Sequence, residues 1–183
     1  MGIMPENLEN IGEYGFSFNY NLMLKELPQK LTSIGSRAFI GNRKITFKKL
    51  PSSLTELNNQ IFSDCYLINI TEFGDNNLIN TLKIANNPFS SAGKGNISTE
   101  INFTIWGNII ADSQIFSSYL NLDSKDENLV PSATVTWHRS EDLNEDSTLG
   151  DELISIIKGW FPASYNKFKK ITILGANDSY AEE

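Results

Sequence analysis

The residue types that most often carry out catalysis are scarce in this chain of 183 residues. It contains a single cysteine, Cys65, and a single histidine, His138. A cysteine nucleophile needs a base close by, but the two residues are far apart in the sequence, and His138 follows Trp137 in a segment that alternates as a strand. We therefore expect a structural role for Cys65 and a structural or solvent-facing role for His138, with no intrachain disulfide, no catalytic residue and no cofactor.

Sequence patterns that bind phosphate or metal ions are incomplete. The segment Gly93-Lys94-Gly95 lacks the rest of a phosphate-binding loop, because Pro88 stands where the first glycine should fall. Acidic pairs occur at Glu141-Asp142 and Glu145-Asp146 in a polar linker. They could bind a divalent cation weakly, but they lack the spacing of a calcium loop, so we predict no metal site.

Charge is distributed unevenly along the chain. The net charge is −7, yet the segment 25–49 carries seven basic residues against one acid, Glu26, while 123–152 carries nine acids against two basic residues. The acidic total argues against nucleic acid as the main partner. No apolar stretch approaches the ~20 residues of a membrane span, and the start MGIMPENLEN lacks the features of a signal peptide. We predict no membrane insertion.

The elements that would position any site follow a repeat of 23 residues. Pro5, Pro28 and Pro51 begin three rows that align without a gap: PENLENIGEYGFSFNYNLMLKEL, PQKLTSIGSRAFIGNRKITFKKL and PSSLTELNNQIFSDCYLINITEF. Six apolar columns recur. They are Leu8/Leu31/Leu54, Ile11/Ile34/Leu57, Phe16/Phe39/Phe62, Leu22/Ile45/Ile68, Leu24/Phe47/Ile70 and Leu27/Leu50/Phe73. A repeat of this length is typical of a solenoid, in which stacked neighbours bury these columns as ladders.

The repeat continues less regularly to residue 122. Phe89 and Phe116 extend the phenylalanine column, and the segments 101–103 and 120–122 supply the following apolar-x-apolar pair. We therefore predict about five repeats of 23–27 residues over 1–122, with 123–183 as a separate C-terminal element. The predicted structural ladder consists of Phe16, Phe39, Phe62, Phe89 and Phe116 with a corner column of Asn19, Asn42 and Cys65.

Strands are expected at the apolar-x-apolar segments, with tight corners at Gly12, Gly35 and Asn58, which tolerate positive φ. The polar residues that alternate with the apolar ones then face outward and form the candidate binding surface. These residues are Asn21, Met23, Lys25, Lys44, Thr46, Lys48, Leu67, Asn69 and Thr71. Their lysines would suit an acidic protein surface or an anionic glycan. The alternative, that the lysines only keep an open sheet soluble, remains equally open.

The pattern L-x-x-I-G-x-x-A-F-x-x-[NC]-x-x-[IL]-x-[IF] resembles the BspA-like leucine-rich repeat. The resemblance is close over residues 5–73, weaker over 74–122 and absent afterwards. It implies an α/β-type, right-handed leucine-rich-repeat solenoid with short parallel strands, used for binding and without catalysis. Members of this family occur in bacterial surface proteins, in phage virion proteins and in some protist surface proteins.

After Asp123 the period is lost. The segment 132–137 alternates as a strand, 148–161 reads as an amphipathic helix with Leu153, Ile156, Ile157, Trp160 and Phe161 on one face, and 170–174 is a further strand. This irregular α+β region is either a cap over the last repeat or an attachment element for a neighbouring chain. The first repeat would likewise expose its ladder unless another chain or an upstream segment covers it.

Two functions follow from these expectations. The first is a non-catalytic interaction module that presents a sheet face to a protein or glycan, at a bacterial cell surface or on a phage particle. The second is a structural subunit of a phage tail or virion, whose ends are buried by neighbouring subunits. An accessory domain of an enzyme is a third and weaker interpretation.

Overall fold

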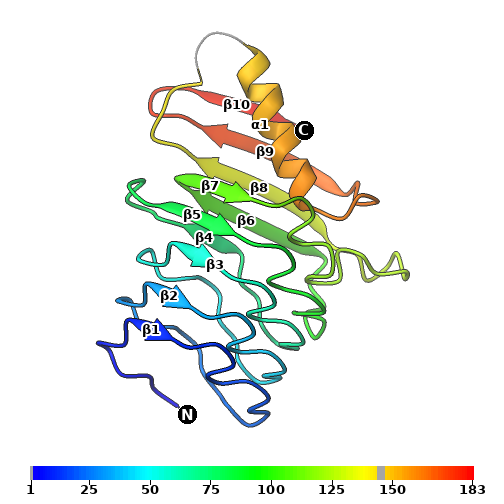
Figure 1. Ribbon diagram of the computed structural model, residues 1–183. Helices are drawn as coiled ribbons and strands as arrows, with labels where there is room; N and C mark the ends of the chain where they lie inside the picture. The colour runs from blue at the N-terminus through cyan, green and yellow to red at the C-terminus, as the bar shows by residue number, and fades with distance from the viewer. Residues whose placement is uncertain (1, 144–146) are drawn as a thin grey trace.

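The computed structural model describes residues 2–143 and 147–183, so the acidic pair Glu145-Asp146 lies outside the described residues. The described elements follow one another along a stack of rungs (Figure 1). They are β1 (Asn10–Ile11), β2 (Ser33–Ile34), β3 (Glu56–Leu57), β4 (Glu72–Gly74), β5 (Thr81–Ile84), β6 (Glu100–Trp106), β7 (Asn108–Ala111), β8 (Ser132–His138), α1 (Ser147–Trp160), β9 (Phe168–Leu174) and β10 (Ser179–Glu182).

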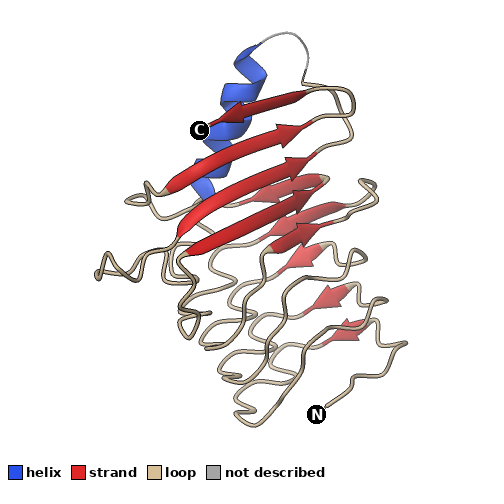
Figure 2. Ribbon diagram, turned by 180° about the vertical axis from the view of Figure 1, so that it is seen from behind, coloured by secondary structure: helices blue, strands red, loops and turns tan. Residues whose placement is uncertain are grey.

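Two sides of the stack are lined by parallel strands. On one side β1 pairs with β2, and further along β3, β5 and β7 form a sheet; on the other side the order is β4-β6-β8-β9-β10. All pairs are parallel except that between β9 and β10. Figure 2 shows the longer strands of the second sheet lying side by side. The architecture is that of a repeat solenoid, with two sheet-lined sides joined by corners.

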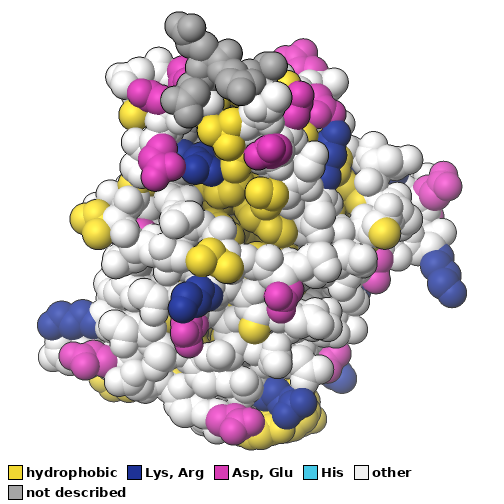
Figure 3. Space-filling view, turned by 45° about the horizontal axis from the view of Figure 1, so that its top comes forward, with side chains coloured by type: hydrophobic (Ala, Val, Ile, Leu, Met, Phe, Trp, Pro, Cys, Tyr) yellow, Lys and Arg dark blue, Asp and Glu magenta, His cyan; other side chains and the backbone are white. Residues whose placement is uncertain are grey.

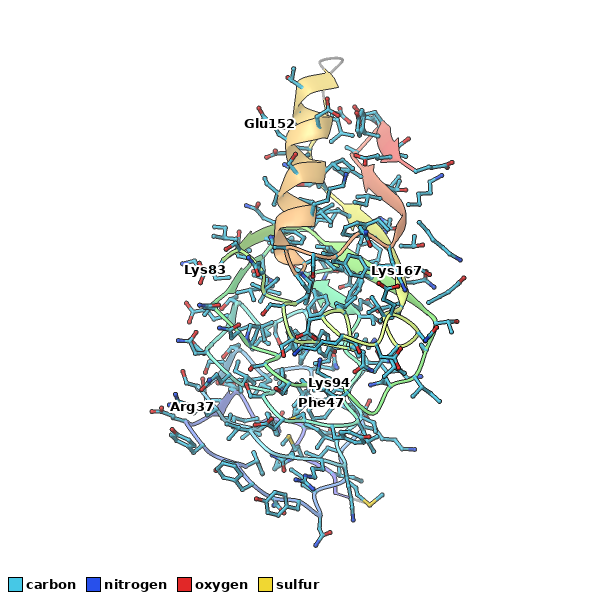
Figure 4. All side chains as sticks on the ribbon, turned by 90° about the vertical axis from the view of Figure 1, so that its right-hand side faces the viewer. Arg37, Phe47, Lys83, Lys94, Glu152 and Lys167 are labelled. Carbon is cyan, nitrogen blue, oxygen red and sulfur yellow. The ribbon has the colours of Figure 1, made fainter. Side chains whose placement is uncertain are left out.

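A column of phenylalanine rings runs through the interior between the two sides. The ring centroid of Phe39 lies 5.4 Å from that of Phe16 and 5.7 Å from that of Phe62, and Phe62 lies 5.8 Å from Phe89. Phe116 follows at 6.1 Å from Phe89. All except Phe16 are buried, and burying such a side chain stabilises the fold by about 1.5–3 kcal/mol. Phe47, labelled in Figure 4, is also buried and packs edge-on against Phe39 and Phe62.

The positions of positive φ at the corners differ from those predicted from glycine and asparagine. Gly12, Gly35 and Asn58 do not adopt positive φ; the left-handed residues come two positions later, at Tyr14, Arg37 and Gln60. Gly35 is required for another reason. A Cβ there would lie 2.4 Å from the backbone N of Glu13, so only glycine lets the two rungs approach.

The strand assignment from sequence was wrong for the first three rungs. The expected segments around 22–24, 45–47 and 68–70 are extended but are not strands, and the strands of these rungs are instead β1, β2 and β3. Adjacent extended segments share one or two backbone hydrogen bonds, such as Thr46 N to Leu24 O (2.9 Å) and Asn69 N to Phe47 O (3.1 Å). These are too few for a continuous ladder. In β6, which contains Ile101 and Phe103, seven residues pair in register with β8.

The C-terminal elements were predicted well in type and position. The expected strands at 132–137 and 170–174 are β8 and β9, and the expected helix at 148–161 is α1. Two details were wrong. Ile156 is 47 % exposed, and Ile154 is buried in its place. The segment 120–122 is a turn in which Leu120 and Asn121 have positive φ, so the strand that follows Phe116 is β8.

The end of α1 occupies the next place in the stack. Phe62 N donates to Pro88 O (2.9 Å), the carbonyl that precedes Phe89, and Phe116 N donates in the same way to Trp160 O (2.9 Å), which precedes Phe161. The Phe161 ring then packs edge-on against Phe116 at 5.3 Å. The rung geometry therefore continues beyond the point where the sequence period is lost.

Candidate binding surface

The nine residues predicted to face outward all lie on the side of the stack that β4, β6, β8 and β9 continue. Six of them are exposed and three are half-buried, while their apolar neighbours point inward. The exposed residues are Asn21, Met23, Lys25, Lys44, Lys48 and Leu67, and the half-buried ones are Thr46, Asn69 and Thr71. They lie in the extended segments described above, so the surface is a face of stacked backbone and not of regular strands in these rungs.

The structure extends this face over three further rungs that the sequence did not suggest. Thr104 N donates to Thr71 O (2.8 Å), and the register then pairs Thr104 with Thr136 and Thr136 with Thr172. A parallel column passes from Asn102 through Thr134 to Lys170. The alternations N-F-T, T-V-T and K-I-T indicate that these three strands turn polar residues toward the same face. The irregular spacing of the three segments obscured this pattern in the sequence.

Charge divides the face into two parts. Lys25, Lys44 and Lys48 form no ion pair with any residue that the structure describes, and the Lys44 ammonium donates only to the Asn21 side chain at 3.0 Å. In the last rungs lysines are neutralised by carboxylates: Lys170 pairs with Glu183 at 2.6 Å, and Lys169 pairs with Glu100. The uncompensated positive charge therefore lies in the N-terminal half of the face.

An aromatic pair lies at the carboxyl ends of β6 and β8. The rings of Trp106 and His138 stack with centroids 3.8 Å apart, and partial burial lowers the pKa of His138. The indole of Trp137, on the inner side of β8, donates to Gly107 O at 2.8 Å. These contacts give His138 a packing role at the edge of the sheet.

Different side chains of the corner column donate hydrogen bonds to backbone carbonyls in successive rungs. Asn42 is fully buried, and its amide nitrogen donates to the carbonyls of Phe16 and Phe39, both at 2.7 Å. Cys65 replaces it one rung later and donates its thiol to Phe39 O at 3.0 Å. Burial raises the pKa of the Cys65 thiol to about 12, so it is protonated at neutral pH and is no nucleophile. Asn19, expected in the same column, is exposed because its rung is the first in the described stack.

Two asparagines with the same role escaped the sequence interpretation. Asn96 donates to Ile68 O at 2.9 Å and to Gly93 O at 3.1 Å, and Asn121 donates to Asn96 O at 2.8 Å. The corner column itself continues at Ala92 and Tyr119, which follow Phe89 and Phe116 by three residues and whose backbone N donates to the phenylalanine carbonyl. Asn96 and Asn121 are therefore a second pair of asparagines, outside that column.

Among residues 2–143 and 147–183, no group of three or more His, Cys, Asp or Glu side chains is placed to hold a metal ion. None of the helices in this part of the chain is long and apolar enough to cross a membrane. Asp142, of the acidic pair Glu141-Asp142, accepts hydrogen bonds from Asn177 N (2.7 Å) and Asn177 Nδ2 (3.1 Å).

Comparison with known proteins supports the resemblance seen in the repeats. A family model described as a BspA type leucine-rich repeat region, in six copies, matches residues 3–123, which is well over half of the chain. Searches of curated proteins and of solved structures returned no significant match. Leucine-rich repeat domains of this type are generally non-catalytic modules for protein interaction or adhesion. The chain belongs to the BspA-type leucine-rich repeat family.

Proposed function

We propose that this protein is a non-catalytic interaction module whose N-terminal sheet face binds the acidic surface of a partner protein. The observation that carries the proposal is the group of exposed lysines Lys25, Lys44 and Lys48, which lie on a continuous face and have no carboxylate partner among the described residues. Complementary charge raises the rate of association and selects among partners. An anionic glycan is the alternative ligand for the same face.

The architecture proposed for this role is a right-handed solenoid over 1–122 with a C-terminal cap over 123–183. Support for the cap comes from the packing of Phe161 against Phe103 (5.4 Å) and Phe116, and of Trp160 against Trp137 (5.3 Å). Because α1 and β9 follow the last rung, they cover the ladder that this rung would otherwise expose. The antiparallel strand β10 ends the parallel sheet.

A selection experiment tests the binding face without a known partner. A random peptide library displayed on yeast is panned against the full chain, and the enriched peptides are measured against the triple variant Lys25→Glu/Lys44→Glu/Lys48→Glu. We expect acidic peptides whose affinity falls at least about tenfold in the variant, and which weaken as NaCl rises from about 0.05 M to about 0.5 M. The matched control is Lys30→Glu/Lys83→Glu/Lys125→Glu, which changes the net charge equally on exposed lysines outside the face.

Two results would contradict the proposal. One is that the enriched peptides are not acidic, and the other is that they bind both triple variants as tightly as the unmodified chain. A sulfated polysaccharide that binds the face while no peptide does would favour the glycan alternative.

A second candidate function is a structural subunit of a phage tail or virion, whose ends are buried by neighbouring subunits. It draws on apolar side chains exposed at the N-terminal end of the described stack: Ile3 is 90 % exposed and Met23 is 54 % exposed. In the later rungs Ile110, on the outward side of β7, and Ile156 of α1 are exposed, and Figure 3 shows apolar side chains near the centre of the view between acidic and basic ones. Light scattering coupled to size exclusion separates the two functions, because a monomer at about 100 µM would contradict the subunit.

A location at a bacterial cell surface or on a phage particle belongs to the same proposal. It draws on the adhesion role that is general among leucine-rich repeat modules of this type. The genes beside the one that encodes this chain test it. Tail genes would favour the particle, and surface-export genes would favour the cell.

A further inference from the structure

A groove lies along the corner that leads into the N-terminal sheet face. It has a volume of about 470 Å³, and its walls are formed mainly by Phe18, Tyr20, Arg43, Asp64 and Tyr66. Tyr20, Arg43 and Tyr66 are spaced by 23 residues, so they occupy the same position in three successive rungs. Lys94, labelled in Figure 4, lines the same groove from the next rung.

The aromatic rings of this groove are exposed. Phe18 and Tyr20 are each 53 % exposed and Tyr66 is 52 % exposed, whereas the phenylalanines of the interior column from Phe39 to Phe116 are buried. An aromatic ring that remains half exposed contributes less to the stability of the fold than a buried one. About half of the surface of each of these three side chains therefore remains open to solvent.

Two of the rings are held in place by glycine backbones. A Cβ at Gly41 would lie 2.7 Å from Cδ1 of Phe18, and a Cβ at Gly95 would lie 2.6 Å from Cε1 of Tyr66. Each ring thus rests directly on a neighbouring rung with its other face open. The positive φ of Phe18 recurs at Gly41, Asp64 and Ser91 in the following rungs, so this backbone conformation belongs to the corner of the repeat.

Polar groups of both signs lie between the rings. The Arg43 guanidinium lies 5.7 Å from the centroid of the Tyr20 ring, and Asp64 and Ser91 form the wall beside Gly41. Lys94 is compensated by Asp123 at 2.7 Å. The groove therefore offers donors and acceptors side by side without the excess positive charge of the adjoining sheet face.

We propose that this groove binds an uncharged oligosaccharide, with Tyr20 and Tyr66 stacking on sugar rings and with Arg43 and Asp64 bonding to hydroxyl groups. Tyr20 and Tyr66 are two rungs apart, hence about 10 Å, a span that suits two linked sugars. Each sugar hydroxyl both donates and accepts, which matches the mixed polar groups, and the apolar faces of pyranose rings match flat aromatic surfaces. The site is separate from the lysines of the proposed protein-binding face.

The test uses a printed array of neutral oligosaccharides, including hexose and N-acetylhexosamine chains of two to six units, probed with the full chain. The best binder is then titrated by calorimetry against Tyr20→Ala/Tyr66→Ala, Tyr14→Ala and Gly95→Ala. Tyr14 is the matched control, because it is a similarly exposed tyrosine (44 %) that does not line the groove. Gly95→Ala removes no ring atom but displaces the Tyr66 ring. Thermal unfolding of each variant establishes that it is folded.

We expect the dissociation constant to rise at least about tenfold in the double variant, by a smaller factor in Gly95→Ala, and not at all in Tyr14→Ala. A blank array would overturn the proposal, and so would a sugar that binds the double variant as well as the unmodified chain. Binding of a proline-rich peptide in place of any sugar would also overturn it, since such peptides use aromatic grooves. The triple lysine variant should keep its sugar affinity, so failure here and failure of the protein-binding face are distinguishable.

Discussion

The first three rungs and the last three rungs of this solenoid differ in where the backbone hydrogen bonds between rungs lie. Up to Phe73 the period is 23 residues, the strands are two residues long, and stacked side chains such as Phe39 and Asn42 join the rungs. The later strands β6, β8 and β9 have seven residues each and pair side by side, and a helix replaces a strand on the opposite side. In the strict repeats the backbone hydrogen bonds between rungs lie mainly at the corners, such as Phe39 N to Ile61 O, whereas in the later rungs long strands add a ladder along the face.

The outer surfaces of the early and the late rungs also differ. The early rungs expose lysines without carboxylate partners among the described residues, and the later rungs expose threonine and asparagine beside lysines that are paired. Because a paired lysine offers little net charge to a ligand, the two parts of one face are suited to different contacts.

The largest effect is expected from the phenylalanine column. Phe62→Ala removes a buried ring that stacks on Phe39 and Phe89, so we expect a loss of about 3–5 kcal/mol in the free energy of unfolding, measured with urea. Phe16→Ala should cost clearly less, since Phe16 is half-buried and stacks on Phe39 alone. Equal losses in the two variants would show that the column does not stabilise the rungs as a stack.

A pair of glycines tests the close approach of successive rungs. Gly35→Ala places a Cβ 2.4 Å from Glu13 N, and we expect a loss of about 1–3 kcal/mol. Gly12→Ala has open space within 4 Å and ordinary backbone angles, so it should be neutral or stabilising by up to about 1 kcal/mol. Thermal unfolding of both variants provides the measurement. A lower melting temperature for the Gly12 variant than for the parent chain would argue against this account of the corner.

The asparagine column should matter only where it is buried. Asn42→Ala leaves the Phe16 carbonyl without its side-chain donor and leaves the Phe39 carbonyl with the Cys65 thiol as its only side-chain donor, which we expect to cost about 1–3 kcal/mol. Asn19→Ala, on an exposed position of the same column, should change stability by less than about 0.5 kcal/mol. Chemical unfolding of the two variants provides the measurement. If the Asn42 variant is as stable as the parent chain, the carbonyls find another donor.

The smallest effect near neutral pH concerns Cys65. Its pKa is raised from 9.0 to about 12 by burial, so the folded chain favours the neutral thiol. The stabilisation is complete below pH 9 and is lost as the pH rises from 9 toward 12. Iodoacetamide at about pH 8 should therefore leave the native thiol unmodified and should alkylate it in urea, as mass spectrometry can show. Rapid labelling of the native chain would contradict the buried position.

The sequence predicted the parts of the structure that depend on periodicity. Columns such as Phe39, Ile45 and Phe47 could be assigned inward because the spacing recurs, and the family assignment was confirmed. Strand length could not be predicted, because a ladder forms only where two neighbouring rungs are both straight, as in β6 and β8. The aromatic groove was also missed. Phe18 and Ser91 adopt positive φ without being residues that favour it, and only Gly41 and Asp64 in their column give a signal.

The most direct test of the claim that binding lies in the N-terminal half of the face compares variants of its two halves. The dissociation constant of the best acidic peptide is measured for the parent chain, for Lys25→Glu/Lys44→Glu/Lys48→Glu, and for Thr104→Glu/Thr136→Glu/Thr172→Glu, which adds acids to the later rungs. We predict a rise of at least about tenfold for the lysine variant and a rise of less than about threefold for the threonine variant, because screening limits repulsion beyond the adjacent rungs. Equal losses in the two variants, or a larger loss in the threonine variant, would contradict the assignment of binding to the N-terminal half.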